Sequence, residues 1–262
     1  MKMERSQKIR LAIQLLFLLL SLAFLALTIA GTRLSIHQGC PYAIVCFGLS
    51  GTTFLQLANT IAWLSIFAGF LILVYGMFRG RKFCAYVCPL GTAQEGVFAL
   101  RSKKYRTKKR VPWLYERKYA FVKYLILLLT SVMVIRGVGY LFIQLCPFYA
   151  LSRLPIIGQR GLLLLVLILF AGFFTERFWC RFLCPYAALM NVFQWIGARI
   201  GLKRRKVKRN LERCNDCGVC MLYCPMNINI AEYEYVRDPN CIHCQICAEK
   251  CPKPGTYSEE FE

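Results

Sequence analysis

Four long apolar stretches alternate with polar, strongly basic connections along the chain. They cover residues 11–30, 57–78, 119–135 and 161–174. The first two are long enough to cross a bilayer as helices, which takes about 20 residues. In the third, Lys123 stands near the start, where a lysine side chain can reach the lipid headgroups. The fourth is free of charge for only about 14 residues, so a buried or re-entrant helix is an alternative to a span there.

The lysines and arginines are distributed unevenly between these stretches. Residues 1–10, 79–118 and 176–213 hold 4, 12 and 10 of them, whereas residues 31–55 and 136–160 hold 1 and 3. Basic connections stay on the cytoplasmic side of a membrane. The pattern therefore predicts four transmembrane helices in the cell inner (cytoplasmic) membrane, with the N- and C-termini in the cytoplasm.

The composition supports a membrane protein, and the positions of the basic residues decide between nucleic acid and lipid as their partner. Hydrophobic residues make up 57% of the 262 residues, above the 45–50% or so of soluble domains. The net charge of +21 is typical of proteins that bind nucleic acid or anionic lipid. Because the basic runs at 103–110 and 203–206 lie near the ends of predicted spans, membrane topology and the lipid bilayer account for them, and we expect no nucleic-acid partner. The first stretch is longer than the core of a secretory signal and no clear cleavage site follows it, so we interpret it as a retained anchor.

A C-x-x-x-C-P motif closes the second apolar stretch and recurs 96 positions later, where it closes the fourth. Cys-Pro pairs also follow the first and third stretches, at Cys40 and Cys146. Two spans per half preserve orientation, so the halves should be related by a parallel pseudo-twofold axis along the membrane normal. We expect a membrane domain over residues 1–202, with one repeat at about 9–100 and the other at about 117–202.

Eight of the 15 cysteines form two C-x-x-C-x-x-C-x-x-x-C-P runs in the tail, residues 203–262. The runs resemble the bacterial two-cluster ferredoxin pattern, in which the fourth cysteine of each run ligates the other cluster. That resemblance implies a ferredoxin-like α+β domain with two [4Fe–4S] clusters. It assigns Cys214, Cys217, Cys220 and Cys251 to one cluster, and Cys241, Cys244, Cys247 and Cys224 to the other.

Two other uses of eight cysteines fit this tail poorly. Zinc modules group their ligands as separated C-x-x-C pairs, and a disulfide framework conflicts with a cytoplasmic location. Neither run has an acid–base constellation beside it, so the tail is expected to relay electrons, and the sequence names no catalytic residue.

Four spans, two C-x-x-x-C-P motifs and a two-cluster tail resemble the NapH-like family of ferredoxin-type quinol dehydrogenase membrane subunits. They are also similar to the membrane part of the regulator-like electron donors of nitrous oxide reductase. The resemblance covers nearly the whole chain. It implies an electron-transfer subunit between the quinone pool and other iron–sulfur or cytochrome subunits of an oxidoreductase complex in anaerobic respiration.

Two roles are open for the cysteines of the repeated motif, Cys84, Cys88, Cys180 and Cys184. Cysteines at i and i+4 present adjacent thiols on one helical face, and a pseudo-twofold arrangement would bring both pairs to its axis. Four convergent thiolates suit an additional iron–sulfur cluster or another soft metal. The alternative is structural thiols at a helix start, with Pro89 and Pro185 in the first turn.

The remaining cysteines and both histidines give weaker signals. Cys40, Cys46 and Cys146 fall on the predicted outer side. Cys40 and Cys146 stand at equivalent repeat positions, so the alternatives for them are a disulfide, a place near a partner's cofactor or buried thiols. Together with His37 they are also weak candidates for a metal site. His37 is either a proton acceptor for quinol or an ordinary interfacial residue. His243 stands between two predicted ligands and is expected to tune solvation or hydrogen bonding there.

The sequence leaves two functions in competition. In the first, the protein passes electrons between quinol and a partner redox protein, in either direction. In the second, it is a redox assembly, maturation or regulatory factor of a respiratory metalloenzyme, which an accessory metal site without quinone reactivity would favour. Transport is disfavoured because the spans lack intramembrane acidic residues, apart from Glu176 at an edge.

Overall fold

The computed structural model describes residues 5–29, 42, 44–45, 60–102, 118–138 and 159–261. The predicted candidate residues His37, Cys40, Cys46 and Cys146 lie outside this described part. The described chain is mostly helical, and its helices are α1 (Arg5–Ile29), α4 (Thr60–Arg79), α5 (Lys82–Tyr86), α6 (Pro89–Ala99), α9 (Val122–Ile135), α12 (Gln159–Phe174), the π-helix η2 (Trp179–Leu183), α13 (Pro185–Arg199), α14 (Val219–Leu222), the 3-10 helix η3 (Ile230–Glu232) and α15 (Ile246–Lys250). The strands are β1 (Arg205–Arg209) and β2 (Tyr257–Phe261).

Two helices, α6 and α13, begin at the proline of a repeated motif. In α6 and α13, Pro89 and Pro185 occupy the first turn, where a residue without an N–H loses no hydrogen bond. The preceding residues, Cys88 and Cys184, are extended, with ψ angles of 112° and 111°. The two motifs therefore share their backbone conformation at the second cysteine and the proline, whereas the first cysteine lies in an α-helix in one motif and in a π-helix in the other.

Helices α6 and α13 each pack against one helix of their own half and one helix of the other half. Helix α6 packs against α1 of its own half and α12 of the other, while α13 packs against α9 of its own half and α4 of the other. Likewise, α5 contacts α1 and η2 contacts α9. Each of these contacts in one half thus has a counterpart in the other.

Among the described residues, one helix is long and apolar enough to cross a membrane, over Arg5–Ala23. Shorter apolar helices cover Ile66–Arg79, Val122–Ile135 and Gly161–Phe174. Their surfaces are apolar as well, since residues such as Phe67, Leu128 and Phe170 are more than half exposed. Four transmembrane helices therefore stay a prediction.

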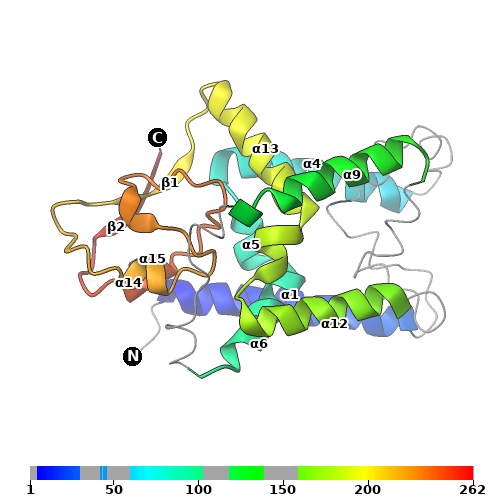
Figure 1. Ribbon diagram of the computed structural model, residues 1–262, viewed down its shortest axis with the longest axis horizontal. Coiled ribbons are helices and arrows are strands. Elements are labelled where there is room, and N and C mark those ends of the chain that lie inside the picture. Colours follow the sequence, from blue (N-terminus) through cyan, green and yellow to red (C-terminus); the bar gives the residue numbers. More distant parts are fainter. Residues whose placement is uncertain are drawn as a thin grey trace.

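The tail lies at one end of the helices, next to the N-terminal end of α1 (Figure 1). Its two strands pair antiparallel, with Val207 opposite Glu259. Buried residues form one cluster that runs from the helices into the tail, and it includes Leu73, Met190, Val207 and Ile242. The tail is therefore packed onto the helices.

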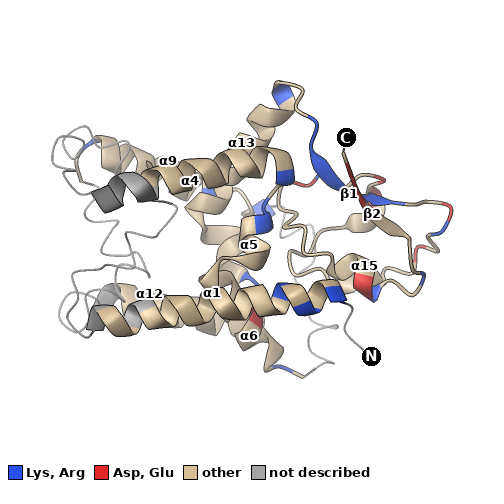
Figure 2. Cartoon of the chain, turned by 180° about the vertical axis from the view of Figure 1, so that it is seen from behind, with Lys and Arg blue, Asp and Glu red and all other residues tan. Residues whose placement is uncertain are grey.

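Most of the described lysines and arginines gather at the end of the helices that faces the tail (Figure 2). Lys123 belongs to this group and is fully buried, with its ammonium donating to the Asn240 side chain in the tail. The sequence placed this lysine among lipid headgroups, but a tail residue distant in sequence supplies its partner instead.

Candidate iron–sulfur sites

Two cavities in the tail are each lined by four cysteines. The first, with about 310 Å³ of empty space that includes open solvent, is bordered by Cys214, Cys217, Cys220 and Cys251. The second, with about 400 Å³ measured in the same way, is bordered by Cys224, Cys241, Cys244 and Cys247. In each case three cysteines come from one run and the fourth from the other. Four cysteine thiols around a hollow are the donor set that a [4Fe–4S] cluster requires, so the residues present fit that group.

The two ligand loops curl in the same way. The residues before and after the second cysteine of each run have positive φ angles, +50° and +70° at Asp216 and Gly218, and +52° and +62° at His243 and Gln245. Only glycine adopts this region without a steric cost. Left-handed residues on both sides of a cysteine turn the chain around the cavity, which allows thiols three positions apart to face one space.

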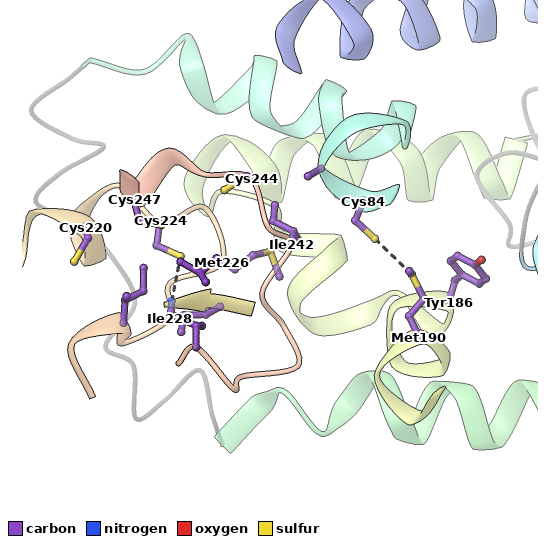
Figure 3. Close-up of a cluster of buried hydrophobic side chains, with 14 of the residues drawn as sticks. Cys84, Tyr186, Met190, Cys220, Cys224, Met226, Ile228, Ile242, Cys244 and Cys247 are labelled. Carbon is purple, nitrogen blue, oxygen red and sulfur yellow. Dashed lines mark hydrogen bonds between the residues drawn. The ribbon is translucent and has the colours of Figure 1, made fainter. Parts of the chain in front are cut away.

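Hydrogen bonds reach several of these sulfur atoms. The Ile228 N–H donates to Cys224 Sγ over 3.5 Å (Figure 3), and Arg209 Nη1 lies 3.6 Å from Cys214 Sγ. Tyr257 lines the same cavity as Cys220. Donors to ligand sulfurs, together with burial, set the reduction potential of a cluster.

Burial raises the pKa of the Cys241 and Cys247 thiols above its usual range.

In the described part of the chain, no three His, Cys, Asp or Glu side chains converge tightly enough for a single metal ion. Four tetrahedral thiolates on one zinc ion would lie about 3.8 Å from each other, whereas a cluster places several atoms between them. The cavities match the larger group.

The second cavity adjoins the helical part. On α1, Gln7 Nε2 donates to the Cys244 carbonyl over 2.7 Å, and His243 is packed against Gly80 at the end of α4. Arg81 Nη1 donates to Asn240 Oδ1 over 3.3 Å. The first cavity lies farther out, and Cys217 at its edge is exposed.

The four cysteines of the repeated motif lie together where the two halves meet. Cys84 and Cys180 are buried, and Cys88 and Cys184 are half-buried. The Cys84 thiol lies 3.9 Å from Met190 Sδ (Figure 3). At the equivalent place in the other half, Gln94 Nε2 lies 3.9 Å from Cys180 Sγ.

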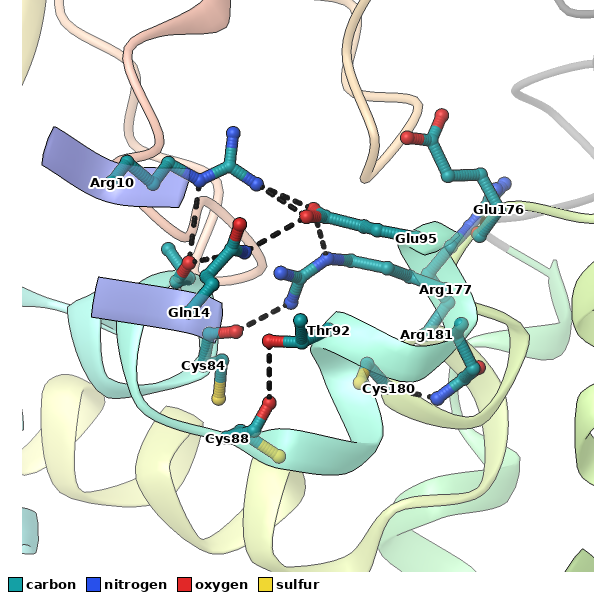
Figure 4. Close-up of polar contacts among 12 residues, drawn as sticks. Arg10, Gln14, Cys84, Cys88, Thr92, Glu95, Glu176, Arg177, Cys180 and Arg181 are labelled. Carbon is teal, nitrogen blue, oxygen red and sulfur yellow. Dashed lines mark hydrogen bonds and ion pairs between the residues drawn. The ribbon is translucent and has the colours of Figure 1, made fainter. Parts of the chain in front are cut away.

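Two arginines, also 96 positions apart, connect the motifs. Arg81 Nη2 donates to the Cys180 carbonyl over 3.2 Å, and Arg177 Nη1 donates to the Cys84 carbonyl over 2.6 Å (Figure 4). Each arginine therefore binds the first cysteine of the other half. Both side chains are fully buried, with exposed fractions of 0%.

Arg177 has a carboxylate partner. Its Nε lies 2.7 Å from Glu95 Oε1, and Arg10 Nη2 lies 2.6 Å from the same carboxylate. Gln14 Nε2 adds a third donor at 2.9 Å (Figure 4). Burial favours the neutral form of Glu95, but the two arginines and the Gln14 amide outweigh it and lower the pKa of this carboxyl.

Sequence reasoning missed these arginines and Glu95. The signal for Arg81 and Arg177 was present, because they stand three positions before the first cysteine of each motif. Nothing local marked Gln7, Arg10 or Asn240, whose partners are distant in the chain.

A family model described as "4Fe-4S binding domain" matches residues 60–108 and 157–207. These segments contain both C-x-x-x-C-P motifs and end before Cys214, the first cysteine of the tail. No solved structure matches the chain.

Curated relatives cover most of the chain. The putative electron transport protein YccM of Escherichia coli (strain K12) is 29% identical over 196 residues, which is 71% of this chain and 53% of YccM. An uncharacterized protein of Methanocaldococcus jannaschii is 31% identical over 198 residues, 73% of this chain and 78% of the relative. The ferredoxin-type protein NapH of Haemophilus influenzae is 30% identical over 205 residues, 74% of this chain and 68% of NapH. The chain spans about half the length of YccM.

Proposed function

Since the chain belongs to the NapH-like family of ferredoxin-type proteins, we propose that it is a membrane-bound relay between quinol and a partner redox protein. The two cysteine-lined cavities of the tail carry this proposal. Cys214, Cys217, Cys220 and Cys251 would hold one [4Fe–4S] cluster, and Cys224, Cys241, Cys244 and Cys247 the other. Each bound cluster would accept and release one electron, and oxidation of a quinol supplies two electrons and two protons.

The positions of the cavities give the relay an order. Gln7 and Arg81 hold the loop of Cys244 against the helices, while Cys217 at the first cavity is exposed. The second cavity would therefore face the donor in the membrane and the first the partner protein. Asp216, beside Cys217, is 73% exposed and forms an ion pair of 2.6 Å with Arg209, so polar groups border the face on which that partner would bind.

The distribution of charge supports the membrane arrangement. Four spans with the tail in the cytoplasm would place the basic ends of the helices and the tail on the same side, where basic residues are retained. Most of the described lysines and arginines lie at that end in Figure 2. Lys82 on this side is bound to the tail through Glu259, with 2.7 Å between Nζ and Oε2.

The order can be tested by removing one ligand from each cavity of the full-length protein in detergent. EPR would follow cluster reduction after anaerobic addition of a menaquinol, and dithionite, which needs no binding site, would serve as the control reductant. We expect Cys217→Ala to lose one cluster signal, with the other still reduced by menaquinol. In Cys244→Ala, the remaining cluster should respond to dithionite only.

Three results would contradict the proposal. Clusters that respond to dithionite but never to menaquinol in the unaltered protein would remove the quinol donor. Loss of menaquinol reduction in Cys217→Ala, with retention in Cys244→Ala, would reverse the order. A protein without iron and acid-labile sulfide after anaerobic purification would remove the relay altogether.

A further inference from the structure

The junction of the two halves holds a surplus of buried positive charge. Arg10, Arg81 and Arg177 are at most 4% exposed. The carboxylate bound there is Glu95, which pairs with Arg10 and Arg177. A buried charge is costly unless an opposite charge compensates it.

Arg81 lacks such compensation among the described residues. Its hydrogen bonds go to the Asn240 side-chain oxygen and the Cys180 carbonyl, neither of which is a carboxylate. Its Nε has no hydrogen-bond partner, and neither has Nη2 of Arg177. Two buried guanidinium groups, one from each half, thus have unused N–H donors beside the four cysteines of the repeated motif.

We propose that Cys84, Cys88, Cys180 and Cys184 together hold one further iron–sulfur cluster, with Arg81 and Arg177 as the positive groups that offset its negative charge. This inference deepens the proposed relay and rests on it. An oxidised [4Fe–4S] core with four thiolates has a net charge of about −2, which two arginines match. Soft thiolate ligands select such clusters over hard cations.

The site is shared between the halves. Each half supplies two cysteines, one buried and one half-buried, and one arginine that binds the other half's first cysteine. Since either half alone supplies only two thiols, the two segments matched by the family model would form one cluster site between them and not one each.

A chain of hydrogen bonds leads from this site to the second cavity of the tail. Gln7 binds the Cys244 carbonyl through Nε2 and accepts from Arg10 Nη1 over 3.1 Å. Arg10 Nε in turn donates to the carbonyl of Ala85, the residue after Cys84, over 3.3 Å. One electron lost by the membrane donor would reduce this cluster, and its reoxidation would pass the same electron to the cluster at Cys244.

The test is the iron and acid-labile sulfide content of the full-length protein, purified anaerobically, with Mössbauer and EPR spectra. We expect about twelve irons per chain and a signal beyond those of the tail. The variant Cys84→Ala/Cys180→Ala should lose about four irons and that signal, with both tail signals retained. If this double variant fails to fold, Cys88→Ala and Cys184→Ala alter the half-buried cysteines and should cause the same loss. Cys217→Ala is the matched control, which should lose about four irons from the tail only.

The arginines need a readout that a purely structural role would leave unchanged. In Arg81→Gln and Arg177→Gln, we expect the midpoint potential of the additional signal to fall, because loss of a nearby positive charge favours the oxidised cluster. Arg81→Lys keeps the charge and should recover most of the shift. The potential of the cluster at Cys217 should stay constant in all three variants.

Several outcomes would overturn this inference. About eight irons in the unaltered protein, zinc at the four cysteines, or an unchanged iron content in the cysteine variants would each exclude the additional cluster. Eight irons with reduction of the tail by menaquinol would leave the proposed relay intact. Twelve irons without reduction by menaquinol would retain the site and contradict the quinol donor.

Discussion

Gly80 lies where the tail meets the helices, and replacing it by alanine should weaken that contact. It follows the last residue of α4 with φ of +65° and donates its N–H to the Gly76 carbonyl, as a C-terminal cap does. A Cβ at this position would lie 2.5 Å from Nε2 and 2.7 Å from Cδ2 of His243. The ring is 5% exposed, so surrounding atoms restrict its movement.

Two costs add at Gly80, and a second glycine separates them. A left-handed φ costs a non-glycine residue about 1–2 kcal/mol, and overpacking costs about 1–3 kcal/mol more. Gly201, after the last helix of the second half, has φ of +75°, and a Cβ added there would have no atom within 4 Å. Gly201→Ala should therefore cost about 1–2 kcal/mol, and Gly80→Ala about 2–5 kcal/mol.

Thermal unfolding of both variants in detergent, under anaerobic conditions, would measure the difference. Hydrogen exchange of residues 239–245 would show whether the tail contact is the part that weakens. Gly80→Ala/His243→Ala should lose less stability than the two single changes together, because the clash is removed. Equal losses in the two glycine variants, with unchanged exchange at 239–245, would refute the packing of His243 on Gly80.

Three further predictions concern charge and metal. Glu95→Gln leaves Arg177 buried without a carboxylate and should lower the free energy of unfolding by about 3–5 kcal/mol. The pKa of Glu95 is lowered from 4.5, so its stabilisation is present above pH 4.5 and is lost as the pH falls through the lower pKa of the folded protein. The unfolding curves of wild type and variant should therefore converge on acidification. Lys82→Ala removes a largely buried ion pair of 2.7 Å and should cost about 1–3 kcal/mol. Lys208→Ala, whose bridge to Glu260 is exposed to solvent, should cost clearly less, and equal losses of the two variants in denaturant unfolding would contradict this ranking. Anaerobic removal of iron by a chelator should expose the tail to protease at residues 210–224 before the helices are cut, because metal binding stabilises the folded loops. Mass spectrometry of the fragments would show the order of cleavage, and cleavage of the helices before the tail would contradict this prediction.

The sequence predicted local features well and distant contacts poorly. Spacing alone separated the tail cysteines into two runs, and the cavity linings support the exchange of Cys224 and Cys251 between them. The proline of each C-x-x-x-C-P motif marked a helix start, which the structure has at Pro89 and Pro185. Each of these signals lies within a few residues of the feature that it predicts.

Long-range partners could not be predicted in the same way. Nothing near Arg10 in the sequence indicates that it binds Glu95, 85 positions away, and nothing near Lys123 indicates Asn240. The number of spans also stays a prediction, because one described helix meets the length and hydropathy of a span and three are shorter. The fold of the chain decides these pairings, and local propensity carries no information about them.

The exchange of helices between the halves makes the chain resemble a homodimer joined into one polypeptide. Contacts of this kind are isologous, since the same patch on each half meets its own copy, and covalent fusion removes the requirement that both copies stay identical. The residues at the equivalent positions 95 and 191 differ, Glu in the first half and Asn in the second. Glu95 binds α1 through Arg10, whereas Asn191 lies beside Tyr124 of α9. One half thus uses this position to hold its own first helix, and the other uses it at the surface where the tail is attached, since Asn191 also binds Asn240 of the tail.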